Sequence, residues 1–293
     1  MTTTDKRSAQ LRLLLGFSVL LLFFVWLGMH GTQRVLWWDE YMSVWLTGGA
    51  HLGPLPLEES LARISIDRYQ TPGYYLLLRG WGTLAGWSDF ALHYFTLLMA
   101  TLTLALLYRL GCTLGLGRRV ALLAVLLCVG SVFYMAYAIE ARAYMSYVLG
   151  AAWVMIAYWR LRQGRGGRAE LIALALGTGF LIYMHYYALL TLIPIGLDWL
   201  FFAPRRRWDV FGALLVGGLL FLPWLPTAFE DVFFAAGNPG AVRHLALTPE
   251  RLLRALAQEF SSGSPALLLL LIGAGLRWSG AAYRLLWLWL LAV

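Results

Sequence analysis

The chain has few acidic residues, two cysteines and one lysine. Of its 293 residues, 15 are Asp or Glu and 23 are Lys or Arg. Cys112 and Cys128 lie at or inside apolar segments without a partner pattern, which argues against a disulfide framework or a cysteine metal site. Only 13% of the residues are charged and 60% are hydrophobic. One soluble core cannot bury that much apolar surface, so the composition excludes an ordinary soluble domain and indicates a polytopic helical membrane protein.

Long apolar runs recur along the chain, and we interpret nine of them as membrane-spanning helices. The first follows a short basic tail, and because no small-residue cleavage site follows it, we expect an uncleaved helix. The predicted spans lie at about 11–28, 90–108, 120–136, 144–159, 171–184, 187–202, 210–229, 265–276 and from 285 onward. The chain stops within the ninth span, as a fragment of a longer protein would.

The positions of the basic residues predict which side of the membrane each loop faces. With the N-terminus inside, 15 of the 23 basic residues fall on the inner side, as the positive-inside tendency requires. This orientation needs a turn at His185, because one helix over 171–202 would place Arg205, Arg206 and Arg207 outside. The basic excess is then an orientation signal and an attraction to anionic membrane lipids, and no nucleic-acid partner is needed.

The predicted outer side holds the longest loops. The first, about 31–89, contains a charged and aromatic stretch at 55–84 that predicts helices lying along the membrane interface. A second long loop, about 230–264, contains a good helix start at Thr248-Pro249-Glu250. With the outer connections 137–143 and 184–186, these loops are expected to meet over one cavity in a single transmembrane domain that covers 1–293.

Five short motifs follow one another along the chain. They are Asp39-Glu40, Thr71-Pro72-Gly73-Tyr74-Tyr75-Leu76-Leu77-Leu78, Ser88-Asp89-Phe90-Ala91-Leu92, Ile139-Glu140-Ala141-Arg142-Ala143-Tyr144 and Leu222-Pro223-Trp224-Leu225-Pro226. In this order they resemble the GT-C glycosyltransferases of family 39, which include protein mannosyltransferases and bacterial aminoarabinose transferases. The resemblance runs from 37 to about 226. It departs from the family pattern at Gln70-Thr71-Pro72 and at His93, so no role is carried over to those positions.

The resemblance implies an all-α GT-C fold and a function. It implies transfer of a sugar from a polyprenyl-phosphate donor to a protein, lipid or glycan acceptor, as in protein glycosylation or lipopolysaccharide modification. The active site would face the periplasm or the cell exterior. The motifs are more similar to those of bacterial relatives than to eukaryotic ones, and 22 Arg to one Lys is typical of GC-rich genomes. We therefore expect a bacterial inner membrane.

The chemistry can also be argued from the residues themselves. A sugar on a lipid phosphate has a good leaving group, so the reaction needs a base for the acceptor proton and a cation for the departing phosphate. Asp39 or Glu40 is the candidate base, and a one-step displacement would invert the anomeric carbon. Arg142 is the first candidate for the phosphate, since a guanidinium fork matches phosphate oxygens. Arg79 is the second.

Other residues of the outer side have competing interpretations. Glu140 could orient Arg142, hold a divalent cation such as Mg²⁺ or Mn²⁺ with Asp39, bind the acceptor, or only neutralise Arg142 at a helix start. His185 is a candidate ligand for a metal or the acceptor, or an interface residue. Aromatic rings stack on sugars and isoprenoid tails, but an aromatic belt at the membrane surface explains them equally well; the rings concerned are Trp38, Tyr74 and Tyr75.

A transporter or flippase for a lipid-linked or small polar substrate is the alternative function. Transporters usually carry ionisable residues or broken helices near the bilayer midplane. In this chain the charges gather at the predicted outer interface and the helix centres are almost entirely apolar. This distribution favours an enzyme over a transporter. A structural scaffold would show no special dependence on Asp39 or Arg142.

Overall fold

The computed structural model describes residues 3–49, 53–68, 70–204, 207–237 and 280–292, with a few single positions between 248 and 273. Within these residues the regular secondary structure is helical except for one short antiparallel pair of strands, in which Gly48 pairs with Pro54. The prediction of an all-α protein is confirmed. The predicted span at 265–276 and most of the predicted loop at 230–264 lie outside the described residues.

The chain divides into two compact units, 1–188 with 207–219, and 189–206 with 220–293. The first unit contains α1 (Thr3–Gly31), α2 (Trp38–Thr47), β1 (Gly48–Gly49), β2 (Gly53–Pro54), α3 (Leu57–Asp67), α4 (Pro72–Ala85), α5 (Asp89–Thr113), α6 (Arg118–Val129), α7 (Val132–Ala138), α8 (Tyr144–Arg162), α9 (Arg168–Met184) and α11 (Trp208–Leu219). The second unit contains α10 (Ala188–Leu197) from Leu189 onward, the π-helical turn η1 (Asp198–Phe202), the 3-10 turn η2 (Leu222–Trp224), α12 (Leu225–Gly237) and α15 (Ala281–Ala292).

Two described helices are long and apolar enough to cross a membrane, 14–31 within α1 and the whole of α5. Two bent pairs also qualify if each is one span: α6 with α7, bent by 71°, and α11 with the segment 222–234. The sequence predicts the first pair as one continuous helix, but the Ser131 side chain accepts the Tyr134 N–H and starts a new helix there. Two to four apolar helices of sufficient length indicate membrane association.

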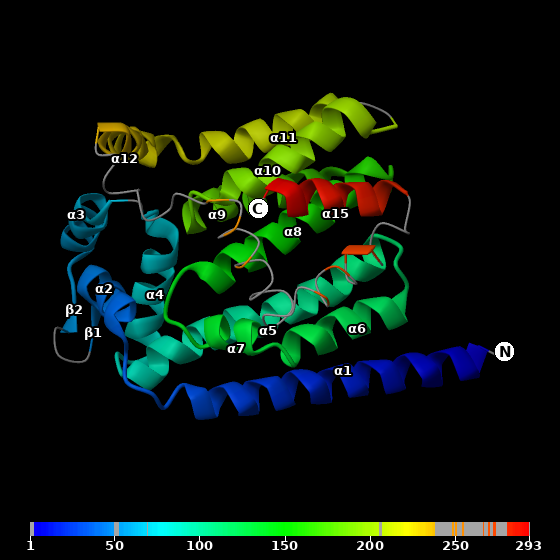
Figure 1. Ribbon diagram of the computed structural model, residues 1–293, viewed down its shortest axis with the longest axis horizontal. Coiled ribbons are helices and arrows are strands. Elements are labelled where there is room, and N and C mark those ends of the chain that lie inside the picture. Colours follow the sequence, from blue (N-terminus) through cyan, green and yellow to red (C-terminus); the bar gives the residue numbers. More distant parts are fainter. Residues whose placement is uncertain are drawn as a thin grey trace. The chain divides into compact units, whose positions relative to one another are not determined.

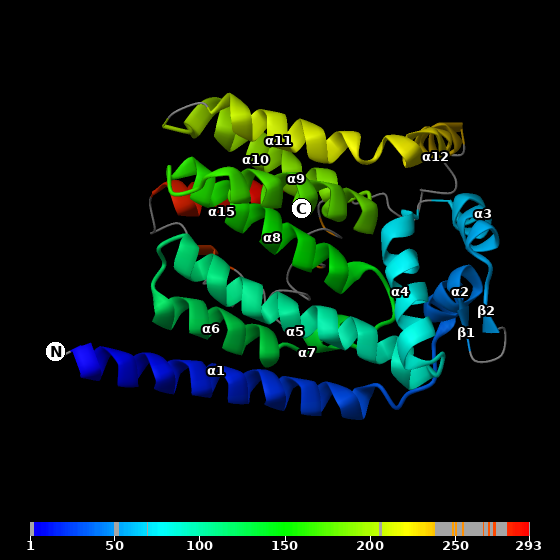
Figure 2. The ribbon, with the colours of Figure 1, turned by 180° about the vertical axis from the view of Figure 1, so that it is seen from behind.

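The first unit is built on a row of helices. α1 packs on α5, α5 on α8, α8 on α9, and α9 on α11, while α6 and α7 pack against α5. A buried cluster of Phe24, Leu97, Leu104 and Val125 joins α1, α5 and α6. Figures 1 and 2 show α2, α3 and α4 gathered at the end of this row where α1 ends and α8 begins. The row therefore presents the start of α8 to the helices of the first loop.

The segment after α1 forms the short helices that the sequence predicts for 55–84. α3 and α4 both contact α2 or its following strands. α4 begins with Pro72 at its first turn, where the missing N–H costs nothing. The helices are confirmed, and their place along the membrane interface stays a prediction.

Gly73, in the first turn of α4, lies against the end of α9. A Cβ at this position would lie 2.5 Å from the carbonyl oxygen of Tyr183 and 2.5 Å from Met184 Cε, closer than real contacts allow. Gly73→Ala is therefore expected to lower the free energy of unfolding by about 1–3 kcal/mol, measured by denaturant titration in detergent. Gly80→Ala in the same helix is the control, because its Cβ would meet nothing within 4 Å. Gly80→Ala should leave the free energy of unfolding unchanged or raise it by up to about 1 kcal/mol. If both variants lose the same free energy of unfolding, the close approach of Gly73 to the end of α9 is contradicted.

Candidate functional site

The first turn of α2 carries Asp39 and Glu40 but places them in different environments. α2 begins after Trp37, and Glu40 Oε2 accepts the Trp37 N–H at 3.0 Å, which satisfies one of the unpaired donors at the helix start. The Glu40 side chain is fully buried, whereas Asp39 is half-buried. Adjacent helical residues point about 100° apart, because a turn holds 3.6 residues. One carboxylate of the motif therefore faces inward and the other does not.

Four groups surround the Glu40 carboxylate. Besides the Trp37 N–H, its Oε1 accepts Arg34 Nη2 at 2.7 Å and the Ala141 N–H at 2.8 Å, and it lies 3.0 Å from His93 Nε2. Burial raises the pKa of Glu40, but the hydrogen bonds from His93, Trp37 and Ala141 outweigh it and hold the pKa below its ordinary value. Glu40 is thus an ionised, buried carboxylate that is held by hydrogen bonds.

His93, where the chain departs from the family pattern, has no role predicted from the sequence. Its side chain lies in α5 and is fully buried, with Nδ1 3.1 Å from the Thr32 carbonyl oxygen and Nε2 on Glu40. A carbonyl oxygen only accepts, so Nδ1 carries a proton. The contact between His93 Nε2 and Glu40 Oε1 is buried and connects α2 to α5.

The peptide group of Ala141 is clamped by two side chains of α2. Its N–H donates to Glu40 Oε1 at 2.8 Å, and its carbonyl oxygen accepts from Ser43 Oγ at 2.7 Å. Glu40 and Ser43 are three residues apart and thus on the same helix face. Both side chains are buried, so the two hydrogen bonds exclude water. α2 thereby fixes the turn between α7 and α8, which carries Glu140 and Arg142.

Arg142 and Asp39 are brought together by this clamp. Arg142 is half-buried, and its Nη1 donates to the backbone carbonyl of Asp39 at 3.2 Å. A guanidinium has five N–H groups, and a second side-chain hydrogen bond joins Arg142 to Tyr144. The Asp39 carboxylate makes no hydrogen bond or ion pair within the described part of the chain. The site therefore places a cation beside a carboxylate without joining the two side chains in an ion pair.

Glu140 lies in the same turn and is only 9% exposed. Burial, and then the negative charge of Glu40, raise its pKa to about 7, although the charge of Arg142 acts in the opposite direction. Near neutral pH a large fraction of Glu140 is therefore protonated. A carboxyl group in this state is a poor counter-ion for Arg142, which leaves the guanidinium charge available to a ligand.

The raised pKa of Glu140 predicts a pH-dependent stability. Between pH 4.5, the ordinary pKa of this group, and about 7, the folded chain binds more protons than the unfolded chain, so this group makes stability fall as pH rises. Glu140→Gln stays neutral, and its stability relative to wild type is expected to be about 1–3 kcal/mol more favourable at pH 8 than at pH 5. Thermal unfolding at the two pH values measures this. Glu58→Gln, at an exposed position of α3, should change stability little at either pH, and a pH-independent difference for Glu140→Gln would contradict the assignment.

His185, in the turn after α9, lies next to Arg142. Burial, and then the charge of Arg142, lower its pKa to about 4, so the ring is neutral at pH 7. Its Nδ1 accepts the Tyr187 N–H at 3.2 Å, which places the ring proton on Nε2. The ring centroids of Tyr144 and Tyr147 each lie 6.3 Å away. The turn predicted at His185 exists, and it adds a neutral N–H donor to the surroundings of Arg142.

The three aromatic residues considered for stacking differ in exposure. Trp38 is 76% exposed, whereas Tyr74 and Tyr75 are 0% and 1% exposed. The Tyr75 hydroxyl donates to Gln70 Oε1 at 2.8 Å, and the Tyr74 hydroxyl lies 3.3 Å from Thr96 Oγ1. The stacking role predicted for the two tyrosines is therefore corrected, because their rings pack inside the protein. Trp38 alone of the three presents an open ring.

Arg79, the second candidate for phosphate, is committed elsewhere. Its Nε and Nη2 both donate to the Leu55 carbonyl oxygen, at 3.0 and 2.9 Å. This bidentate contact ties α4 to the strand before α3. Among the residues that the structure describes, no three His, Cys, Asp or Glu side chains lie close enough together to hold a metal ion. The divalent cation considered for Glu140 and His185 therefore enters no step of the proposal below.

Comparison with known proteins gives no match: no protein-family model, no curated protein and no solved structure is similar to this chain. The GT-C resemblance therefore depends on the five sequence motifs. The geometry around Asp39 and Arg142 is independent of it.

Proposed function

We propose that this chain is a membrane glycosyltransferase of the GT-C type that moves a sugar from a polyprenyl-phosphate donor to a hydroxyl group of a protein, lipid or glycan acceptor. The observation that carries the proposal is the junction of α2 with the turn before α8. It holds the Asp39 carboxylate, which has no hydrogen bond or ion pair with any residue that the structure describes, next to the half-buried guanidinium of Arg142. These are the base and the phosphate ligand that the reaction needs.

In the proposed reaction the acceptor hydroxyl oxygen attacks the anomeric carbon, and Asp39 takes the hydroxyl proton. The bond between the anomeric carbon and the phosphate oxygen breaks, and its electron pair leaves with the polyprenyl phosphate. Arg142 stabilises the charge on that phosphate, and the Nε2–H of His185 is a second donor nearby. One displacement inverts the anomeric centre, as in one-step glycosidases.

Glu40 and His93 act as positioning residues in this proposal. Glu40 holds the Ala141 peptide through its N–H, and Ser43 holds it through its carbonyl. Arg142 is the next residue, so its position depends on these two buried hydrogen bonds. Charge-stabilising groups are effective when they are fixed before the reaction starts. This division assigns catalysis to Asp39 and structure to its neighbour Glu40.

The proposal also includes a topology. α8 begins beside Arg142 and has Arg160 and Arg162 in its last turn. Under the positive-inside tendency the last turn is cytoplasmic, so the Asp39–Arg142 site faces the periplasm or the cell exterior. The N-terminus is then cytoplasmic, and nine spans in a bacterial inner membrane complete the arrangement. Polyprenyl-phosphate sugars are membrane-bound donors, which suits a site at the outer end of α8.

Full-length protein in nanodiscs, incubated with a panel of polyprenyl-phosphate sugars and acceptors, tests the proposal. We expect transfer from one donor, and a decrease of about a hundredfold in Arg142→Ala, the loss seen when one charge-stabilising donor is removed. Arg63→Gln, an arginine of α3 outside the site, is the control and should keep the wild-type rate. If the wild-type protein binds a lipid-linked sugar without transferring it, the proposal fails and the transporter or flippase becomes the better function.

A further inference from the structure

A cavity lies far from Asp39, between α5, α8 and α9. Its volume is about 310 Å³, within the size range of small-ligand sites. Arg160, one of its lining residues, follows the first residue of α8, Tyr144, by 16 positions. At 1.5 Å per helical residue this is about 24 Å along the axis. The cavity therefore belongs to the opposite end of the helix row from the proposed active site.

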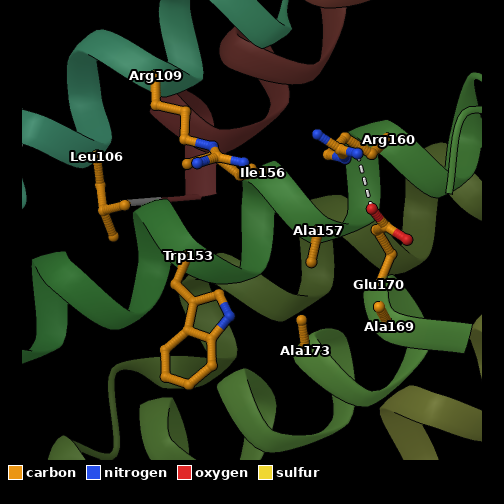
Figure 3. A pocket seen from close by; sticks show the side chains of 9 residues that line it. All are labelled: Leu106, Arg109, Trp153, Ile156, Ala157, Arg160, Ala169, Glu170 and Ala173. Atoms are coloured by element: carbon orange, nitrogen blue, oxygen red, sulfur yellow. Dashed lines mark ion pairs between the residues drawn. The ribbon is translucent and has the colours of Figure 1, made fainter.

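The polar lining of this cavity carries one excess positive charge. Figure 3 shows Arg109, Arg160 and Glu170 on one side of it, with the Arg160–Glu170 ion pair drawn as a dashed line. Arg160 Nη2 lies 2.7 Å from Glu170 Oε1, and Glu170 Oε2 accepts the Gly167 N–H at 2.8 Å. Arg109 makes no ion pair or hydrogen bond with any described residue, and the buried Nε of Arg160 has no partner there. The lining thus has two cationic side chains and one carboxylate, and that carboxylate is already paired with Arg160.

The rest of the lining is apolar, and apart from Ala169 it lies deeper along each helix than the charged residue. Leu106 precedes Arg109 by almost one turn of α5, and Trp153 precedes Arg160 by two turns of α8. Ala173 follows Glu170 by almost one turn of α9. In all three helices the charged residue is therefore the one nearer the helix end. The cavity is amphipathic, with a cationic mouth and an apolar interior, and α5 is itself long and apolar enough to cross a membrane.

We propose that this cavity binds an anionic glycerophospholipid, with the lipid phosphate at Arg109 and the first part of one acyl chain against Trp153 and Ala173. The Arg109 guanidinium, which has no partner among the described residues, supplies charge complementarity for the phosphate. The apolar interior, at the end of a helix of membrane-spanning length, favours a lipid over a soluble phosphate. The proposal does not rest on sugar transfer, because it uses no residue of the Asp39 site.

Native mass spectrometry of the full-length protein in detergent micelles, with added phosphatidylglycerol or phosphatidylcholine of equal chain length, tests this. Wild type is expected to bind phosphatidylglycerol about tenfold more tightly, the effect of one charged hydrogen bond. Arg109→Gln should remove this preference, and Arg109→Lys should keep part of it. Arg165→Gln removes the same charge from an exposed loop position and should keep the preference in full. Ala173→Phe, which fills the apolar end, should weaken binding of both lipids.

Three results would overturn the proposal. If Arg109→Gln and Arg165→Gln lose the preference for phosphatidylglycerol equally, the anionic lipid is attracted to the basic protein in general and not to this cavity. Displacement of the lipid by millimolar inorganic phosphate would mean a site for soluble anions. Unchanged lipid binding in Ala173→Phe would mean that no chain enters the cavity. Thermal unfolding of each variant, required to match wild type within a few degrees, separates these outcomes from misfolding.

Discussion

Replacing Glu40 with alanine is expected to lower the free energy of unfolding by about 3–5 kcal/mol, because it leaves buried hydrogen-bonding groups unsatisfied at about 1–3 kcal/mol each. The variant leaves Nε2 of the fully buried His93 ring without its contact to Glu40 and the Ala141 N–H without an acceptor. Arg34 loses less, because its side chain is 38% exposed and can turn to water. Denaturant titration of the purified protein in detergent measures the change.

Two comparisons make this prediction specific. Asp39→Ala, one residue away, should change stability by less than about 1 kcal/mol, because the Asp39 carboxylate has no described partner. His93→Ala should cost clearly less in the Glu40→Ala background than in wild type, since the two side chains form one pair. If Asp39→Ala and Glu40→Ala lower the free energy of unfolding equally, Glu40 is not the buried carboxylate that stabilises the fold.

The second large effect is on activity and concerns Asp39. Asp39→Asn is expected to lower the rate of sugar transfer by at least about a hundredfold, and by up to about ten-thousandfold, the range for loss of a general base. Asparagine keeps the size of the side chain but cannot take the acceptor proton. The backbone carbonyl that binds Arg142 is retained, so the phosphate ligand keeps its position. Single-turnover transfer from the donor identified with wild type measures the effect.

Retention of donor binding is the control for Asp39→Asn. Its dissociation constant for the donor lipid should stay within about threefold of wild type, since Arg142 supplies the phosphate contact. Arg142→Ala should instead weaken donor binding as well as transfer. Full activity in Asp39→Asn would remove this residue as the base and would leave the proposed mechanism without one.

The helices of this protein could be predicted where apolar runs are long and uninterrupted. α5, within which the sequence predicts a span at 90–108, is the clearest case. The prediction was less successful at 120–136, where Ser131 caps a new helix inside an apolar run. One serine that can cap a helix is a weak sequence signal for a helix break when the other sixteen residues of the predicted span are apolar. Hydrophobicity therefore predicts that a segment is buried or in lipid, but not where its axis changes direction.

The site was predicted only in part, because its organisation depends on contacts between distant residues. The sequence points to Asp39, Glu40 and Arg142, but adjacent carboxylates in one motif cannot be assigned separate roles without knowing which face of α2 is covered. His93 lies 53 residues from Glu40, and a single histidine in an apolar helix gives no sign of its partner. Arg34 and Ser43 were missed for the same reason. The exposure of Tyr74 and Tyr75 was likewise set by packing of α4 and not by their residue type.

The clamp on Ala141 has a consequence for the order of events during synthesis. Glu40 and Ala141 are separated by 101 residues, and at about 5–20 residues per second a ribosome needs about 5–20 seconds to add them. During that interval the nascent α2 has its carboxylate and its serine in place but no peptide to hold. Arg142, the next residue, is added directly after the peptide that the clamp holds. A newly made chain therefore acquires the complete pairing only after α1, α2 and α5 have all been synthesised.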